Sequence, residues 1–124
     1  MVNIPISIGE LVDKITILEI KKINISDDVK LLLIETELTH LNTILETIDV
    51  DVSDIKKSLF DVNSELWGVE DGLRDMERDK LFGIKFVELA RSVYRLNDER
   101  FRLKDTINNM CDSDIKEVKS YKDY

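Results

Sequence analysis

The sequence has 124 residues and contains only one cysteine, one proline, one histidine and four glycines. A single cysteine cannot build a disulfide scaffold, and a single histidine excludes a histidine-rich metal site. Because glycine and proline most often interrupt helices, their scarcity predicts long and continuous ones. No apolar run approaches the roughly 20 residues that span a bilayer, and no secretory leader pattern opens the chain, so we expect a soluble cytoplasmic protein without membrane contact.

Positive charge is also scarce, because 18 Lys and Arg stand against 26 Asp and Glu, for a net charge of −8. An acidic chain lacks the basic surface of a general nucleic-acid binder, so we expect no nucleic-acid partner. The hydrophobic content of 43% is too high for a disordered chain. The length suits one domain, and we expect residues 1–124 to form a single helical domain.

Two helices are predicted in the first half of the chain. Ser7 and Glu10 have the spacing of a capping box, which predicts a helix from about Ile8 to about Ile23. A second helix is expected to follow Ser26 as its N-cap and to end near residue 49. Its apolar residues recur every three or four positions, as in a packed bundle helix: Leu31, Ile34, Leu38, Leu41, Leu45 and Ile48.

Two longer helices are predicted in the second half. The third is expected to run from its N-cap Ser53 to about Lys80, and the fourth from the corner at 81–83 to about Met110. Arg100 alone interrupts the apolar stripe of the fourth helix, and Ser113 is expected to cap a short segment that reaches Val118. Short links predict an all-α fold, an antiparallel bundle of four long helices or two helical hairpins, followed by this short C-terminal helical segment or tail.

Polar residues flank the apolar stripes of both long helices. On the fourth helix they are Arg91, Tyr94, Asn97, Asp98 and Phe101, and on the third they are Asn63, Trp67, Glu70, Arg74 and Glu77. Spacings of three or four place each set on one flank of its helix. If the two flanks meet, they form either a pocket for an anionic ligand or a salt-bridge network that fixes helix register.

Small residues and a tyrosine-bearing tail suggest association between chains. Ser64, Gly68 and Gly72 recur every four residues, away from the apolar stripe of the third helix. A glycine inside a helix costs about 1 kcal/mol relative to alanine, and close approach of another backbone would explain it. Tyr121 and Tyr124 are more aromatic surface than a solvated tail needs, so we expect the tail to dock either onto the bundle or onto a partner. We therefore expect these five residues to lie at an interface.

Paired carboxylates raise the question of a metal. Glu10 and Asp13 have the ExxD spacing of all-α nucleotide pyrophosphohydrolases, in which such pairs hold Mg²⁺. The second half of that pattern is missing, because Leu73 stands three residues after Glu70, and Arg74, which would repel a cation, stands four residues after it. His40 and Cys111 show no pattern of a catalytic or metal site. We expect no catalytic residue, no metal ligand and no cofactor.

Four segments carry a resemblance to a known family. They are SIGELVDKITILEIK (7–21), LWGVEDGLRDMER (66–78), FVELARSVYRLNDERFRLKDTIN (86–108) and the terminal KSYKDY. Together they resemble a small uncharacterised family of all-helical proteins from marine bacteria and phages, sometimes encoded near glycosyltransferase genes. The resemblance implies no mechanism. On its matching positions it places any family site at Lys14, Glu70, Arg74, Arg91, Tyr94, Asn97 and Asp98.

Three functions follow, in order of preference. The first is a non-enzymatic interaction or assembly module that forms a homo-oligomer, with a dimer as its simplest form, or binds another protein. The second is a binder, and conceivably an enzyme, of an anionic small molecule such as a nucleotide or nucleotide sugar, held by the polar cluster between the third and fourth helices. The third is a metal-dependent nucleotide hydrolase.

Overall fold

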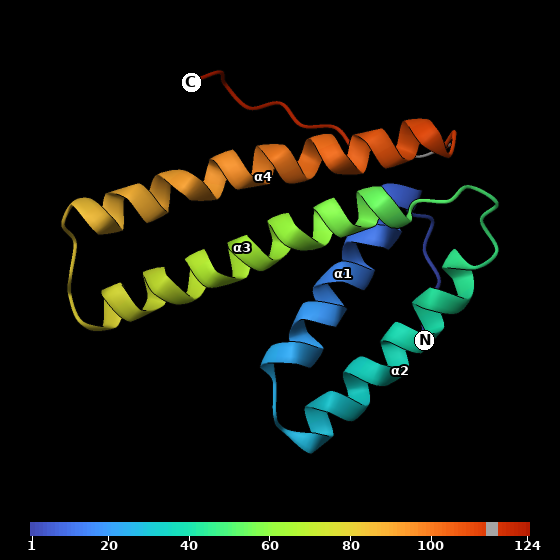
Figure 1. Cartoon of the computed structure of the whole chain (residues 1–124), viewed down its shortest axis with the longest axis horizontal. Coiled ribbons are helices and arrows are strands. Elements are labelled where there is room, and N and C mark those ends of the chain that lie inside the picture. The colour runs from blue at the N-terminus through green and yellow to red at the C-terminus, as the bar shows by residue number, and fades with distance from the viewer. Residues whose placement is uncertain (114–116) are drawn as a thin grey trace.

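The computed structural model of the chain describes residues 1–113 and 117–124 (Figure 1). These residues form four helices and no strand, which confirms the predicted all-α class. The helices are α1 (Ile8–Asn24), α2 (Asp28–Leu45), α3 (Ser53–Arg78) and α4 (Ile84–Met110). Among the helices in the described part of the chain, none is long and apolar enough to cross a membrane.

The helices form two hairpins that meet along α1. The shorter hairpin pairs α1 with α2, and the longer one pairs α3 with α4 (Figure 1). Helix α1 packs against all three other helices, whereas α2 packs along α1 and not along α3 or α4. Of the two predicted arrangements the structure therefore adopts the pair of hairpins, and the two hairpins diverge from their common contact at α1.

The core lies on two sides of α1. On one side Leu11, Ile15 and Leu18 pack against Ile34 and Leu38 of α2. On the other side lies a second apolar cluster, made of Val12, Val52, Leu59 and Ile107. Since α1 supplies residues to both clusters, it is the most buried helix of the fold, as its unusually wide apolar face predicts.

The helix ends agree with the sequence only in part. Ser7 caps α1 as predicted, and its hydroxyl accepts a hydrogen bond from the Glu10 amide at 3.0 Å. The predicted N-cap Ser26 is wrong, because the carboxylate of Asp27 accepts from the Lys30 amide instead. Ser53 is also not a cap but the first residue of α3, since its own amide and hydroxyl donate to Asp51.

The C-terminal segment (117–124) has no regular secondary structure and lies along α4 (Figure 1). The Tyr124 hydroxyl donates to the Asp98 carboxylate at 2.6 Å, and the Tyr124 ring meets the Tyr94 ring edge to face. The helical segment predicted between Ser113 and Val118 falls partly on residues 114–116, which lie outside the described residues. The described remainder is a tail that docks on its own chain.

A glycine permits the closest approach between α1 and α4. The Gly9 amide donates to Oδ1 of Asn108 at 2.7 Å. A Cβ atom at Gly9 would overlap the backbone carbonyl oxygen of Lys104. The close approach predicted at Gly68 is different: within the described residues, a Cβ there would meet no atom outside its own helix within 4 Å. A Cβ at Gly72 would meet Leu89 of α4 at 3.1 Å.

Replacement of Gly9 by alanine is therefore expected to destabilise the fold. The added methyl group pushes α1 away from the α4 backbone, and overpacking of this kind costs about 1–3 kcal/mol. The matched control is Gly68→Ala, which removes a helix-interior glycine without a clash and should stabilise by up to about 1 kcal/mol. Urea denaturation of both variants measures the difference, and a Gly9→Ala protein as stable as the control would contradict the close approach.

Candidate functional site

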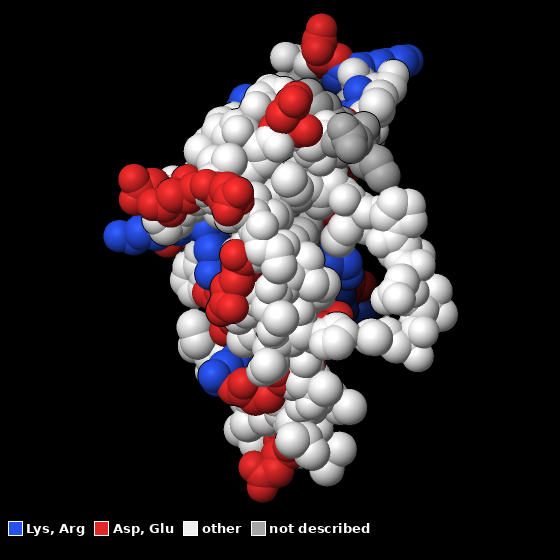
Figure 2. Space-filling model, turned by 90° about the vertical axis from the view of Figure 1, so that its right-hand side faces the viewer, with Lys and Arg blue, Asp and Glu red and all other residues white. Residues whose placement is uncertain are grey.

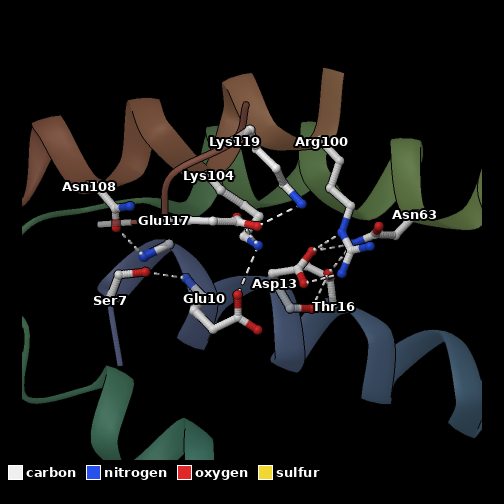
Figure 3. A network of polar contacts seen from close by, with 11 residues as sticks. Ser7, Glu10, Asp13, Thr16, Asn63, Arg100, Lys104, Asn108, Glu117 and Lys119 are labelled. Carbon is white, nitrogen blue, oxygen red and sulfur yellow. Dashed lines mark hydrogen bonds and ion pairs between the residues drawn. The ribbon is translucent and has the colours of Figure 1, made fainter. Parts of the chain in front are cut away.

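A buried carboxylate lies where α1, α3 and α4 meet (Figure 3). Asp13 of α1 is fully buried. Arg100 of α4 donates to both of its oxygens, from Nε at 2.8 Å and from Nη2 at 2.6 Å. Asn63 of α3 donates from Nδ2 to Asp13 Oδ1 and to the Thr16 hydroxyl, each at 2.9 Å. One carboxylate thus binds side chains from both helices of the long hairpin.

This contact explains the single interruption in the apolar stripe of α4. A buried carboxylate is strongly unfavourable unless a cation and hydrogen-bond donors replace its water. Arg100 supplies the cation through a two-point fork, and its hydrogen bond to Asp13 raises the pKa of the guanidinium above its ordinary value. The sequence marks Arg100 as an exception, but nothing near it in the sequence points to a partner in α1.

A second ion-pair group lies one helical turn further along α4. Lys104 is buried, and its Nζ contacts Glu10 Oε2 at 2.8 Å and Glu117 Oε2 at 2.6 Å (Figure 3). Lys119 Nζ contacts the other oxygen of Glu117 at 2.9 Å. Burial opposes the charges of Lys104 and Glu117, but their hydrogen bonds outweigh it, raising the pKa of Lys104 and lowering that of Glu117. This group fastens the C-terminal segment to α1 and α4.

These contacts decide what the carboxylate pair can do. Glu10 and Asp13, the residues with the ExxD spacing, are each bound to a cationic side chain, Lys104 and Arg100 respectively. Within the described residues, no three His, Cys, Asp or Glu side chains gather as a metal site would require. The two cations stand where a divalent ion would bind, so the network supports helix packing rather than metal-assisted hydrolysis.

A groove of about 530 Å³ opens beside Arg100, in the angle between α1 and the α3–α4 hairpin. It contains two of the predicted ligand residues, Glu70 and Arg74, whose side chains form a long, exposed ion pair at 3.9 Å. Its charged groups are Arg74 and Arg100 against Glu70, Asp71 and the Asp13 carboxylate beneath Arg100. Three carboxylates against two cations give no attraction for an anionic ligand. The full lining is Ile17, Ile20, Asn63, Leu66, Trp67, Glu70, Asp71, Arg74 and Arg100.

The other predicted ligand residues lie elsewhere. Tyr94, Asn97 and Asp98 line a hollow of about 1160 Å³ between α4 and the C-terminal segment. Lys14 is exposed beside a third hollow, on the α2 side of α1, and Arg91 is exposed on α4. The structure does not bring the predicted ligand residues together in one cluster between α3 and α4, because Tyr94, Asn97 and Asp98 lie on the side of α4 that faces the C-terminal segment.

The predicted interface residues are likewise divided. Gly68 is exposed on α3, whereas Ser64 and Gly72 are partly covered. Tyr124 contacts α4 of its own chain, and Tyr121 lines the same hollow beneath the C-terminal segment. Their role between chains remains a prediction, and the surface described below is more extensive.

Replacement of Arg100 by methionine tests the central ion pair. The variant keeps most of the side-chain length but leaves the buried Asp13 without its cation, so we expect a loss of about 3 kcal/mol in the free energy of unfolding. The control is Arg102→Met, because Arg102 forms an exposed pair with Glu99 and should change stability by less than about 1 kcal/mol. If urea denaturation shows the same loss of unfolding free energy for both variants, the buried pair of Asp13 and Arg100 contributes no more stability than an exposed pair.

We expect acid to detach the beginning of the C-terminal segment, at Glu117, from α1 and α4. The ion pairs of Glu117 lower its pKa below the ordinary 4.5, so their contribution is present above about that pH and is lost as pH falls through the lowered pKa. NMR signals of residues 118–124 should then move toward disordered values. Glu117→Gln should show the same signals at neutral pH, and unchanged signals in this variant would refute the role of the ion pairs.

Comparison with known proteins gives a family and no activity. The family model of a family of unknown function, DUF6165, matches residues 2–124. No curated protein and no solved structure shows significant similarity to the chain. The match covers nearly every residue of the sequence, in keeping with the resemblance to an uncharacterised helical family. The chain belongs to the DUF6165 family of proteins of unknown function.

Proposed function

We propose that this protein is a non-enzymatic helical interaction module that associates with itself through the outer side of α2. The observation that carries the proposal is the exposure of large apolar side chains on that helix. Val29, Leu32 and Leu33 are 71%, 68% and 67% exposed. Exposed apolar residues that adjoin one another commonly mark a protein-binding surface.

The sequence of α2 supports this interpretation. The first turns of α2 carry apolar residues on more than one side, and a helix with apolar residues all round is normally buried all round. In α2, Ile34 and Leu38 are buried against α1, whereas the opposite side contacts none of the other described helices. We call that opposite side the α2 face, and it consists of Val29, Leu32, Leu33, Thr36, His40 and Ile44.

The N-terminal segment extends the same surface. Met1, Val2 and Ile4 are exposed, and they line a hollow of about 800 Å³ together with Leu33 and Ile44 of α2. Figure 2 shows the side of the molecule that includes the C-terminal end of α2. Residues other than Lys, Arg, Asp and Glu cover a continuous area there, and acidic side chains gather along one edge of it. A protein interface commonly has an apolar centre and a polar rim, and the exposed side chains of Met1, Val2, Ile4 and Leu33 supply apolar surface for such a centre.

The simplest partner is a second copy of the chain, so that a dimer is the smallest assembly, and a different protein is the alternative. We propose that this module acts in the cytoplasm of marine bacteria and is encoded by these bacteria or by their phages, in keeping with the family resemblance. The groove beside Arg100 gives little support to the nucleotide-binding alternative, because the charges that line it do not favour an anion.

Light scattering and analytical ultracentrifugation over a wide concentration range test the proposal. The wild-type chain should show a mass above that of one chain, increasing with concentration. Leu32→Ser/Leu33→Ser should remain monomeric with unchanged helicity, because these side chains are exposed in the isolated chain. Val118→Ser removes an equally exposed apolar residue from the C-terminal segment and should associate like the wild type. A wild-type chain that is monomeric at every concentration would refute self-association.

A further inference from the structure

We infer that the copies associate head to tail, with the tip of the α3–α4 hairpin of one copy docked on the α2 face of the next. The hairpin tip is the segment 80–87, which includes the turn and the first residues of α4. This inference rests on the proposed self-association and adds the second surface that the association uses.

The hairpin tip is unusually apolar for an exposed turn. Leu81, Phe82, Ile84 and Val87 are 58%, 51%, 78% and 50% exposed. A turn between two helices does not require large apolar side chains. Polar residues can form the hydrogen bonds that its backbone needs and keep the surface soluble. Four in one turn form the second exposed apolar area of the chain, and Figure 1 shows the turn at the free end of the long hairpin.

The backbone and aromatic rings give the tip a fixed shape. Lys80 adopts a left-handed conformation with φ of 57°, and the Leu81 amide donates to the Met76 carbonyl at 2.9 Å. The rings of Phe82 and Phe86 meet edge to face, with their centroids 5.3 Å apart. A pre-ordered apolar projection loses little conformational entropy when it binds, which favours its use as an anchor.

Charge favours contact between the tip and α2 over contact between two α2 faces. The segment 80–87 contains two lysines and no acidic residue, whereas the stretch from 27 to 49 contains six acidic residues and one lysine. Among the described residues, Lys85 is in no ion pair, and the pair of Lys80 with Glu77 is exposed and long, at 3.7 Å. These acidic residues border the α2 face and are not part of it, so two α2 faces brought together would bring two acidic borders together, whereas a tip on an α2 face brings its lysines beside an acidic border.

Shape favours the same pairing. The tip is convex, whereas the hollow beside the α2 face is concave and about 800 Å³ in volume. Its walls are mainly aliphatic, from the N-terminal segment, α1 and α2, and its charged residues are Lys14 and Glu37. An aromatic or aliphatic anchor inserted into such a pocket is the usual centre of binding energy in an interface. Phe82 and Leu81 supply anchors of this kind.

The tip cannot reach the α2 face of its own chain. Helix α4 has 27 residues and is therefore about 40 Å long, and Figure 1 shows the tip and α2 on opposite sides of the molecule. The ion pair between Asp13 and Arg100 fixes the long hairpin to α1. The contact must join different copies, and because it uses two different surfaces it repeats into rows or a closed ring. A single turn docked in a hollow forms a small interface, and small interfaces belong to the weak, concentration-dependent class.

Two complementary variants test the inference. The tip variant, Phe82→Ser/Ile84→Ser, keeps the α2 face, and the face variant, Leu32→Ser/Leu33→Ser, keeps the tip. Each alone should be monomeric, whereas their equimolar mixture should form a complex of two chains and nothing larger, because each chain then has one working surface. Sedimentation velocity with one variant fluorescently labelled measures this, and a mixture of labelled and unlabelled tip variant is the control.

The outcomes separate this inference from the proposed function. If the tip variant alone associates as strongly as the wild type, self-association holds and the head-to-tail arrangement is refuted. If the wild type associates but the mixture stays monomeric, the head-to-tail arrangement is again refuted. If every sample is monomeric, both fail. Binding of the wild type, but not of the tip variant, to anionic lipid vesicles without self-association would assign the tip to a membrane and overturn the inference.

Charge reversal gives an independent measurement. Lys80→Glu/Lys85→Glu should weaken the association of wild-type chains about tenfold at low salt, and less at high salt, where screening removes the attraction. Lys57→Glu/Lys122→Glu makes the same change of charge at two exposed lysines away from the tip, and should have little effect. Equal weakening by both double variants would show a dependence on net charge alone and would overturn the contribution of the tip lysines.

Discussion

The arrangement of the molecule depends on the burial of the Asp13 carboxylate. A charge without water must be matched by donors in fixed positions, and here those donors come from α3 and α4. Asn63 and Arg100 thereby set the register of both helices against α1. The contact of Gly9 with Asn108 and the ion pair of Glu10 with Lys104 then fix α4 against α1 at two further points. The long hairpin is held to α1 by polar contacts as much as by apolar packing.

This use of α1 determines what the rest of the fold exposes. Helix α1 gives one side to α2 and its remaining sides to α3 and α4, so no helix is left to cover the outer side of α2. An acidic protein with a net charge of −8 repels itself over most of its surface. Apolar areas at the α2 face and the hairpin tip are the places where that repulsion is weakest, so two copies can approach each other there at the lowest electrostatic cost.

The sequence predicts the helices well because their signals are local. Apolar periodicity and the Ser7 cap lie within a few residues of the structure that they specify. Asp27 replaces Ser26 as a cap because two neighbouring residues offer equivalent side-chain oxygens and only the backbone path distinguishes them.

The candidate site is less predictable because its contacts join distant parts of the chain. Arg100 is visible as an exception in an apolar stripe, but its partner lies 87 positions away. Gly9 shows no sign of its role, since the atoms that exclude a side chain there belong to α4. The polar flanks of α3 and α4 separate because the direction of a flank depends on how the two helices of the long hairpin are rotated against each other, which no periodicity encodes.

The contact between Gly9 and Asn108 has a consequence for how the chain acquires its structure. These residues are 99 positions apart, so the first helix to leave the ribosome completes its packing only when the last helix has been made. Until then α1 and α2 form a small hairpin with one side of α1 uncovered, and an isolated helical hairpin buries too little surface to be stable. The conformational entropy lost in closing so large a loop is compensated only when α4 is complete. Folding is therefore a single cooperative event rather than a stepwise addition of helices. A chain shortened within α4 would lose the structure of its beginning as well as of its end.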